Sequence, residues 1–362
     1  MTGLVRRVLE GLAVPLLAVF SALVVGGVVI ALAGRDPLLA YAGLWQGAFG
    51  SSRAVSETLV WATPYIFTGL AVALAFQGGL FNIGAEGQLA AGAVTAAWLG
   101  VTLPASLGTA SGWLLPVVLL GGIVAGAAWG AIPGWLKART GAHEVINTIM
   151  LNYIALLGVG YLLNGPLRDP TPLNVLARTP PIDVLARLPR FDGDLRVHAG
   201  LLLAFLAVGL VYVVLYRTSL GFAIRTAGAN PDAARYAGMP VGGLIVTTLA
   251  CSGGLAGLAG AVEVTGLHYR HELGFSQGYG FDAITIALLA RVHPLGIVPA
   301  ALLLGALRNG ATGMQFFASV PIDIVTVLEG LILLFVAAEV LVRRLYHLPP
   351  AGPALVLTRG WR

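Results

Sequence analysis

Two strongly apolar runs enclose the polar stretch RTSLGFAIRTAGANPDAARYAGMP, residues 217–240. Its residues 230–232, Asn-Pro-Asp, are a helix-start signal: Asn caps free N–H groups, Pro suits the first helical position, and Asp complements the positive end of the helix dipole. Gly238, followed by Pro240, is expected to end that helix. The stretch therefore predicts one short exposed helix at a membrane surface. An ordinary cytoplasmic loop is the alternative.

The composition is that of a polytopic membrane protein. Of the 362 residues, 57% are hydrophobic and 10% are charged, whereas about a quarter of the residues of a soluble globular protein are charged. The 49 glycines fit this class, because small residues let transmembrane helices approach closely. A net charge of +5 is explained by arginines that anchor loops at anionic lipid headgroups, so no nucleic-acid partner is expected. The single Cys251 excludes an intramolecular disulfide.

The first apolar run, residues 11–33, is long enough to cross a bilayer, which takes about 20 residues. Arg6 and Arg7 precede it, and it ends in Ala-Leu-Ala, so it also has the pattern of a secretory signal peptide. The run is longer than the apolar part of a usual signal peptide. An uncleaved first span with a cytoplasmic N-terminus is therefore favoured.

Residues 59–99 are too long for one span and are interrupted in the middle. Pro64 is expected to bend this segment. The polar and flexible residues that interrupt it are Gly78, Gly79, Asn82, Gly84, Glu86, Gly87 and Gln88. Non-helical backbone at membrane depth is tolerated only where it is buried in protein or lines a cavity. The segment therefore predicts a broken or re-entrant helix pair.

The remaining apolar runs complete the predicted topology. Residues 164–198 are rich in proline and charge, which favours an external loop, and the last span is expected over residues 322–342. On this topology Lys137 and most span-flanking arginines lie inside, as the positive-inside rule requires. Both chain ends are then cytoplasmic, and residues 1–362 form a single transmembrane domain.

Glu86 is the strongest candidate for a functional residue, because an ionisable group in an apolar run costs several kcal/mol unless it is paired or hydrated. It either lines a polar path or accepts hydrogen bonds from free N–H groups and holds the helix break. The same two roles are open for the side-chain amides of Asn82 and Gln88, while Asn147 and Asn152 favour interhelical hydrogen bonds. The predicted substrate path consists of Asn82, Gly84, Glu86, Gln88, Asn147 and Asn152.

A faint internal repeat supports this placement. Phe81-x-x-Gly84-x-x-Gly87 has a counterpart in residues 275–280, FSQGYG, and each has an acidic residue nearby, Glu86 and Asp282 respectively. Corresponding broken segments in two halves of a chain are typical of a transport site.

No enzyme motif is complete. His143-Glu144-x-x-Asn147 lacks the second histidine of the zinc-protease motif, and His268-x-x-His271-Glu272 lacks a third ligand, so no metal site is expected. The only lysine, Lys137, follows a leucine, so the Gly-Lys step of a nucleotide-binding P-loop is missing. The sequence therefore predicts neither an enzyme nor a bound cofactor.

Residues 219–239, SLGFAIRTAGANPDAARYAGM, resemble the coupling loop in permease subunits of ABC importers for branched-chain amino acids, ribose-type sugars and nucleosides. Gly79–Gly92 (GLFNIGAEGQLAAG) and Glu144–Tyr153 (EVINTIMLNY) are similar to the nucleoside-permease branch. The resemblance covers residues 35–345. It implies an all-α polytopic membrane fold with about 8–10 transmembrane helices, including broken or re-entrant segments, and a cytoplasmic coupling helix.

The resemblance also implies the partners and the mechanism. A cytoplasmic ABC ATPase would bind and hydrolyse ATP, a second and non-identical permease would complete the path, and an extracytoplasmic lipoprotein would deliver the substrate. Uptake of nucleosides or simple sugars across the cell membrane would follow by alternating access. The residues implied to couple to the ATPase are Gly221, Arg225, Gly228, Asn230, Pro231, Asp232, Ala234, Arg235, Tyr236 and Gly238.

An ion-coupled secondary transporter of small polar solutes is the alternative. Such a transporter normally needs ionisable side chains inside the membrane, and Glu86, Asp282, Asp323, Glu329 and Glu339 are available for that role. A docking segment for an ATPase distinguishes the two, because an ion-coupled carrier has no use for it.

Overall fold

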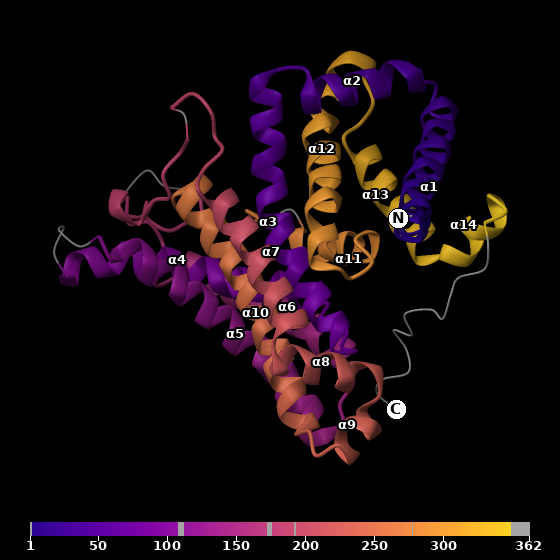
Figure 1. Cartoon of the computed structure of the whole chain (residues 1–362). Helices are drawn as coiled ribbons and strands as arrows, with labels where there is room; N and C mark the ends of the chain where they lie inside the picture. The colour runs from indigo at the N-terminus through magenta and orange to yellow at the C-terminus, as the bar shows by residue number, and fades with distance from the viewer. Residues whose placement is uncertain (1, 108–111, 172–175, 192, 277, 349–362) are drawn as a thin grey trace. The chain divides into compact units, whose positions relative to one another are not determined.

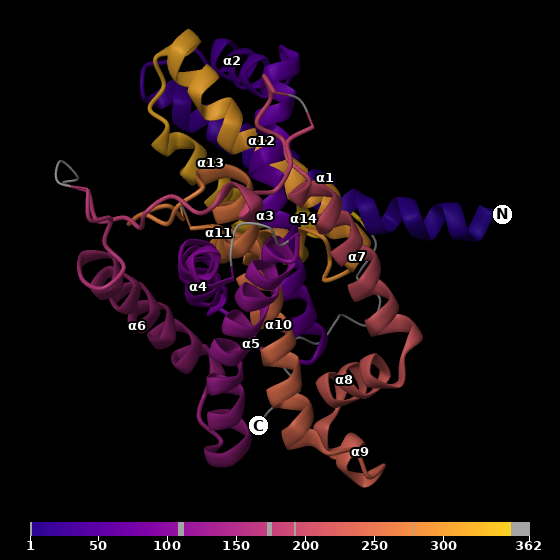
Figure 2. The same cartoon turned by 90° about the vertical axis from the view of Figure 1, so that its left-hand side faces the viewer.

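The computed structural model describes residues 2–107, 112–171, 176–191, 193–276 and 278–348. Their regular structure consists of helices α1–α14, a 3-10 turn (η1) and a π turn (η2), and no strand forms in these residues (Figures 1 and 2). The chain divides into two compact units, one formed by residues 63–284 and the other mainly by the residues before and after them. The two chain ends, residue 1 and residues 349–362, are predicted to be cytoplasmic and lie outside the described residues.

Seven helices among the described residues are long and apolar enough to cross a membrane. Their candidate spans are Ala13–Leu32, Ser52–Gln77, Leu114–Thr140, Glu144–Asn164, Gly200–Arg217, Val241–His268 and Pro294–Ala318. An apolar pair near the C-terminus, α13 (Asp323–Ala337) and α14 (Glu339–Leu345), makes an eighth if it counts as one span. The predicted all-α polytopic membrane fold is confirmed.

The unit of residues 63–284 is built around one central helix, α10. It contains the greater part of α3 (Ser52–Gln77) and the start of α11 (Tyr279–Leu289). Its other elements are α4 (Ala85–Leu107), α5 (Leu114–Thr140), α6 (Glu144–Asn164), η1 (Val184–Ala186), α7 (Gly200–Arg217), α8 (Ser219–Ala229), α9 (Pro231–Tyr236), α10 (Val241–Glu263) and η2 (Val264–His268).

Glycines let α10 pack backbone to backbone against two neighbours. A Cβ at Gly257 would lie 2.8 Å from the Cα of Gly126 in α5, and a Cβ at Gly260 would lie 2.9 Å from the backbone N of Ala93 in α4. Since no real side chain fits at such distances, only glycine allows this approach. Small residues at helix contacts are the usual basis of helix association in membranes.

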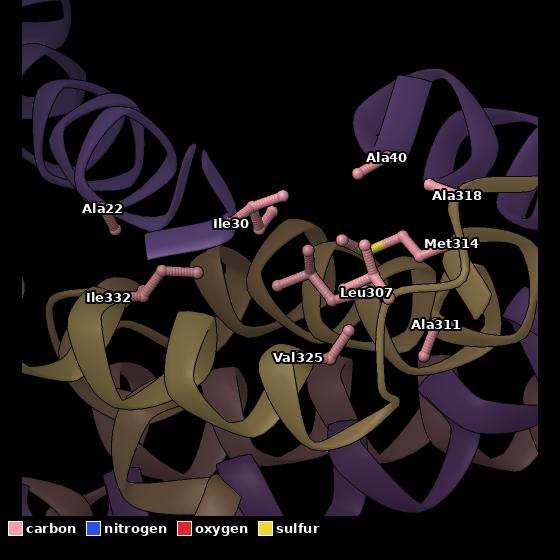
Figure 3. Packing of buried hydrophobic residues seen from close by; sticks show 10 residues of the cluster. Ala22, Ile30, Ala40, Leu307, Ala311, Met314, Ala318, Val325 and Ile332 are labelled. Carbon is pink, nitrogen blue, oxygen red and sulfur yellow. The ribbon is translucent and has the colours of Figure 1, made fainter. Parts of the chain in front are cut away.

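The second unit contains the two ends of the described chain. Its elements are α1 (Thr2–Leu32), α2 (Pro37–Phe49), the start of α3, the end of α11, α12 (Pro294–Ala318), α13 and α14. Side chains from α1, α2, α12 and α13 form its apolar core, in which Ile30, Leu307, Met314 and Ile332 are buried (Figure 3). Asn309 of α12 adds hydrogen bonds to this core: its Nδ2 donates to the backbone oxygens of Gly47 and Ala54.

The C-terminal apolar segment, for which a last span over residues 322–342 is expected, is bent in the structure. It forms two helices, α13 and α14, which meet at Ala338 at an angle of 83°. The Glu339 side chain pairs with two arginines beside this bend: its Oε1 lies 3.7 Å from Arg291 Nη2 and 2.6 Å from Arg343 Nη2. Both ion pairs form at the first residue of α14.

The segment 59–99 also forms two helices. α3 continues through Pro64 to Gln77, residues 78–84 are non-helical, and α4 begins at Ala85. The break thus lies at the glycine and polar residues that interrupt the apolar sequence. Among the described residues of the expected external loop, 164–198, Asn164 ends α6, and the only later helical element is the short turn η1.

The polar stretch 217–240 contains two helices where the sequence predicts one. Thr218 begins α8, since its Oγ1 accepts a hydrogen bond from the Gly221 N–H. The predicted helix start at Asn230 is confirmed: Asn230 Oδ1 accepts from the N–H groups of Asp232 and Ala233, each at 3.0 Å. Gly238 follows α9 with a φ of +78°, which suits glycine.

Candidate transport and coupling sites

The non-helical segment 78–84 is held by a buried pair of side-chain amides. Asn82 Nδ2 donates to Gln88 Oε1 at 2.8 Å and to Ser252 Oγ at 2.7 Å, while Asn82 Oδ1 accepts from the Gly84 N–H at 2.9 Å and from Gln88 Nε2 at 3.1 Å. Asn82 and Gln88 are both buried. The structure thus brings together three of the predicted path residues, Asn82, Gly84 and Gln88.

Asn152 reaches this segment from α6. Its Oδ1 accepts a hydrogen bond from the Gly87 N–H at 2.8 Å, and its Nδ2 donates to the Ile83 carbonyl at 2.8 Å. The first N–H groups of a helix have no partner inside the helix, so Asn152 supplies the missing acceptor at the start of α4. Asn147 takes no part in this network; its Nδ2 is buried without a hydrogen-bond partner.

Glu86 joins the start of α4 to the segment before α11. Its side chain is buried, and its carboxylate accepts hydrogen bonds from Ser276 Oγ and, at 2.8 Å, from the Gly280 N–H. Close by, Tyr65 OH donates to Asp282 Oδ2 at 2.7 Å. The two halves of the faint sequence repeat, residues 81–87 and 275–280, are therefore neighbours in space.

These contacts define what the polar side chains do in the structure. Asn82, Gln88, Asn152 and Glu86 direct their hydrogen-bonding groups to backbone and side chains around the break, which meets the requirement that buried polar groups be paired. The arrangement explains how non-helical backbone is stabilised inside an apolar unit. A role in lining a substrate path stays a prediction for all six residues.

The predicted coupling residues divide into a buried and an exposed set. Among the buried residues are Gly221, Gly228, Pro231 and Ala234, which face the body of the unit. The exposed residues are Asn230, Asp232, Arg235, Tyr236 and Gly238, while Arg225 is half-buried.

The exposed set forms a defined surface on α9. Arg235 Nη1 lies 2.6 Å from Asp232 Oδ1, and the Tyr236 side chain is 97% exposed. α8 and α9 lie together at the end of α10 where that helix begins (Figures 1 and 2). Tyrosine and arginine are enriched among the residues that contribute most to protein–protein binding.

A family model for permease components of branched-chain amino acid transport systems matches residues 54–337. The chain belongs to this family of permeases. The prediction of an ABC-importer permease is thereby confirmed, and the ion-coupled alternative is not favoured.

Three relatives match over nearly the whole permease. A guanosine ABC transporter permease of Bacillus subtilis is 39% identical over 94% of this chain and 97% of the relative. A glucose ABC transporter permease of Haloferax volcanii is 37% identical over 91% and 88%, and a nucleoside ABC transporter permease of Lactococcus lactis is 33% identical over 94% of each chain. No solved structure matches the permease.

Sequence reasoning missed one buried acid of the permease, Glu263. Its side chain is fully buried, neither of its oxygens has a hydrogen-bond partner, and His268 Nε2 lies 3.6 Å from its Oε2. The π turn η2 explains the pairing, because its wider turn brings residues five apart to the same face. The signal was present in the sequence: Glu263 is an ionisable residue in an apolar run, as Glu86 is.

Glu144, which belongs to the incomplete zinc-protease motif, has a structural contact. Its Oε2 forms a buried ion pair with Lys137 Nζ at 2.6 Å, between the end of α5 and the start of α6. Breaking such a pair by removing one partner leaves an uncompensated buried charge, which is strongly destabilising. Glu144 therefore fastens two helices of the permease.

The loop that is predicted to be external, residues 164–198, runs along η2 and the residues after it. The N–H groups of Ile182 and Leu188 donate to the carbonyls of Tyr269 and Thr265, at 2.8 and 2.9 Å. The Arg187 guanidinium lies 4.5 Å from the Tyr269 ring centroid. Beneath this loop, burial lowers the pKa of His271 to about 3.

Acid is expected to destabilise the permease through His271. Because the pKa of His271 is lowered in the folded chain, the unfolded chain binds a proton at a higher pH than the folded chain does. The free energy of unfolding therefore falls as the pH drops below about 6.5, by up to about 1.4 kcal/mol per pH unit. His198, whose pKa burial lowers to about 4, acts in the same direction. The thermal midpoint between pH 7.5 and 4.5 should therefore fall less steeply in His271→Leu than in the wild type.

The exposed His143 provides the control for this measurement. His143→Leu makes the same substitution at a histidine that is not buried, so it controls for the change of side chain itself. Identical pH profiles for His271→Leu and the wild type would contradict the prediction.

Proposed function

We propose that this permease forms the inward path for nucleosides or simple sugars in an ATP-driven importer. The observation that carries the proposal is the α9 surface, where Asp232, Arg235 and Tyr236 are exposed next to the buried face of α8. A surface of this kind fits the groove of a cytoplasmic ATPase. The orientation follows: α8 and α9 are cytoplasmic, and so are both chain ends.

The remaining subunits follow from the same proposal. A partner ATPase binds and hydrolyses ATP, a second, non-identical permease completes the path, and an extracytoplasmic lipoprotein delivers the substrate to the outer loops. The permease itself holds no cofactor. Closure of the ATPase moves α8 and α9, and the permease pair then opens alternately to the outside and to the cytoplasm.

The substrate class rests on the relatives. They are named for guanosine, glucose and nucleosides, which share a sugar ring with several hydroxyl groups. Polar side chains in a membrane path can hydrogen-bond such groups without a charge on the substrate. Nucleosides are favoured over free sugars, because the motifs of residues 79–92 and 144–153 are similar to the nucleoside branch.

The test is uptake of labelled guanosine and labelled glucose in cells that lack this chain, with and without a plasmid that restores it. Restored uptake of either solute, abolished when ATP is depleted and unaffected by a protonophore that leaves ATP intact, supports the proposal. In parallel, the purified chain alone should neither bind nor hydrolyse ATP. ATPase activity that survives removal of every other subunit would overturn the assignment of ATP hydrolysis to a partner.

A further inference from the structure

Helix α8 contacts the break between α3 and α4 through the backbone. Gly228 lies so close to it that a Cβ at this position would be 2.6 Å from the Gly78 carbonyl carbon and 2.7 Å from the Gly79 nitrogen. Ile224, which is 1% exposed, places its Cγ2 3.4 Å from the position of a Cβ on Gly78. Residues four apart share one face of a helix. One face of α8 is therefore fitted onto residues 77–79.

Helix α8 and the end of α3 also contact the end of α7. Arg225 Nε donates to the Leu215 carbonyl at 3.0 Å, and the Arg225 guanidinium lies 5.0 Å from the Tyr216 ring centroid. Tyr216 OH in turn accepts a hydrogen bond from Gln77 Nε2 at 3.2 Å. The end of α3 thus contacts two helices. Its backbone packs against α8, and the side chain of Gln77, the last residue of α3, is hydrogen-bonded to Tyr216 of α7.

From residues 77–79 the chain leads directly into the paired network of the break. Asn82 and Gln88 bind each other, and Glu86 binds Ser276 and Gly280 before and at the start of α11. The segment between residues 77–79 and Glu86 is only a few residues long, and its buried Asn82 side chain is hydrogen-bonded. A displacement of the backbone at Gly78 is therefore expected to be passed on to Glu86.

We propose that Gly228 and Ile224 are positioning residues that transmit movement of α8 and α9 to the break and, through Glu86, to the start of α11. The α8–α9 segment is joined to the rest of the unit through the chain at α7 and at α10. The contact of Gly228 and Ile224 with the break is a third, non-covalent connection. The inference rests on the proposed function, since it requires α9 to be moved by the ATPase.

The decisive variant is Gly228→Ala in the complete importer with its own partner subunits. Its methyl group must displace the backbone of residues 77–79. Uptake is expected to fall by about 10-fold, within the usual range of coupling between sites, while the ATPase subunit still co-purifies and hydrolyses ATP. The number of substrate molecules carried per ATP should fall with it. Gly243→Ala is the matched control, because its methyl group would meet nothing closer than Pro240 Cβ at 3.9 Å.

Ile224→Ala tests the same contact without a clash. It removes the side chain that faces Gly78, and transport per ATP should fall although assembly persists. Leu249→Ala is an equally buried truncation in α10 at a side chain that packs toward Gly134 of α5. It controls for lost core packing and should lower the thermal midpoint without lowering transport per ATP. If Gly228→Ala fails to assemble, Ile224→Ala decides.

Wild-type transport per ATP in Ile224→Ala would overturn the role of this contact, and so would wild-type values in an assembled Gly228→Ala complex. Either result leaves the proposed function standing, because the wild-type importer still carries substrate. Absence of ATP-dependent uptake by the wild-type importer would instead overturn the proposed function, and the inference with it.

Discussion

Uptake is expected to fall by about 100-fold when Glu86 is replaced with alanine. The carboxylate accepts hydrogen bonds from Ser276 and Gly280, and hydrogen bonds to a charged group are worth about 1.5–3 kcal/mol each. Without them the buried Gly280 N–H loses its acceptor, and the start of α11 loses its tie to α4. Transport assays and thermal denaturation of the same purified complex measure the two consequences.

The two readouts separate the roles that the sequence leaves open. A residue that supports the break lowers both the thermal midpoint and uptake, and Glu86→Gln, which keeps one acceptor oxygen, should recover part of each. A residue that only lines the path lowers uptake at an unchanged midpoint. Gly84→Leu is the steric comparison, because a Cβ there already lies 3.0 Å from Asn82 Oδ1. Wild-type uptake kinetics in Glu86→Ala and Gly84→Leu would exclude both roles.

Charge reversal at Arg235 is expected to uncouple ATP hydrolysis from transport and leave the membrane fold intact. The Arg235–Asp232 ion pair is exposed, and exposed pairs contribute only about 0–1 kcal/mol to stability. In Arg235→Glu two carboxylates would instead face the partner, and a reversed charge at an interface costs several kcal/mol. Substrate-stimulated ATPase activity and uptake should each fall by about 10-fold or more.

Arg196→Glu provides the comparison for this variant. It makes the same charge change at an exposed arginine of the loop that is predicted to be external, and it should leave co-purification of the ATPase subunit unchanged. Normal stimulated ATPase activity in Arg235→Glu would argue against α9 as the docking helix.

The parts of the fold that local chemistry determines could be predicted from the sequence. Long apolar runs indicate the spans, and Asn230 with the two residues after it indicates the start of α9. The interruption of residues 59–99 was placed correctly at its glycine and polar residues, because free backbone groups at membrane depth need partners.

Tertiary partners could not be predicted in the same way. Beside the bend at Ala338, Glu339 pairs with Arg291, a residue distant in sequence. The bonds of Glu86 depend on Ser276 and Gly280, about 190 residues further along the chain. Sequence reasoning named Glu86 as costly to bury but had no means of naming what pairs with it. Glu263 was missed although the same rule applied to it.

The glycine contacts of α10 with α4 and α5 limit how the permease can change shape. Helices that touch through Gly126, Gly257 and Gly260 leave no space for a methyl group, and a contact without space for a methyl group also resists sliding or rotation. These three helices should therefore move as one rigid body. Rearrangement during transport is then left to Thr218, between α7 and α8, and to residues 237–240, between α9 and α10, where the backbone is not helical.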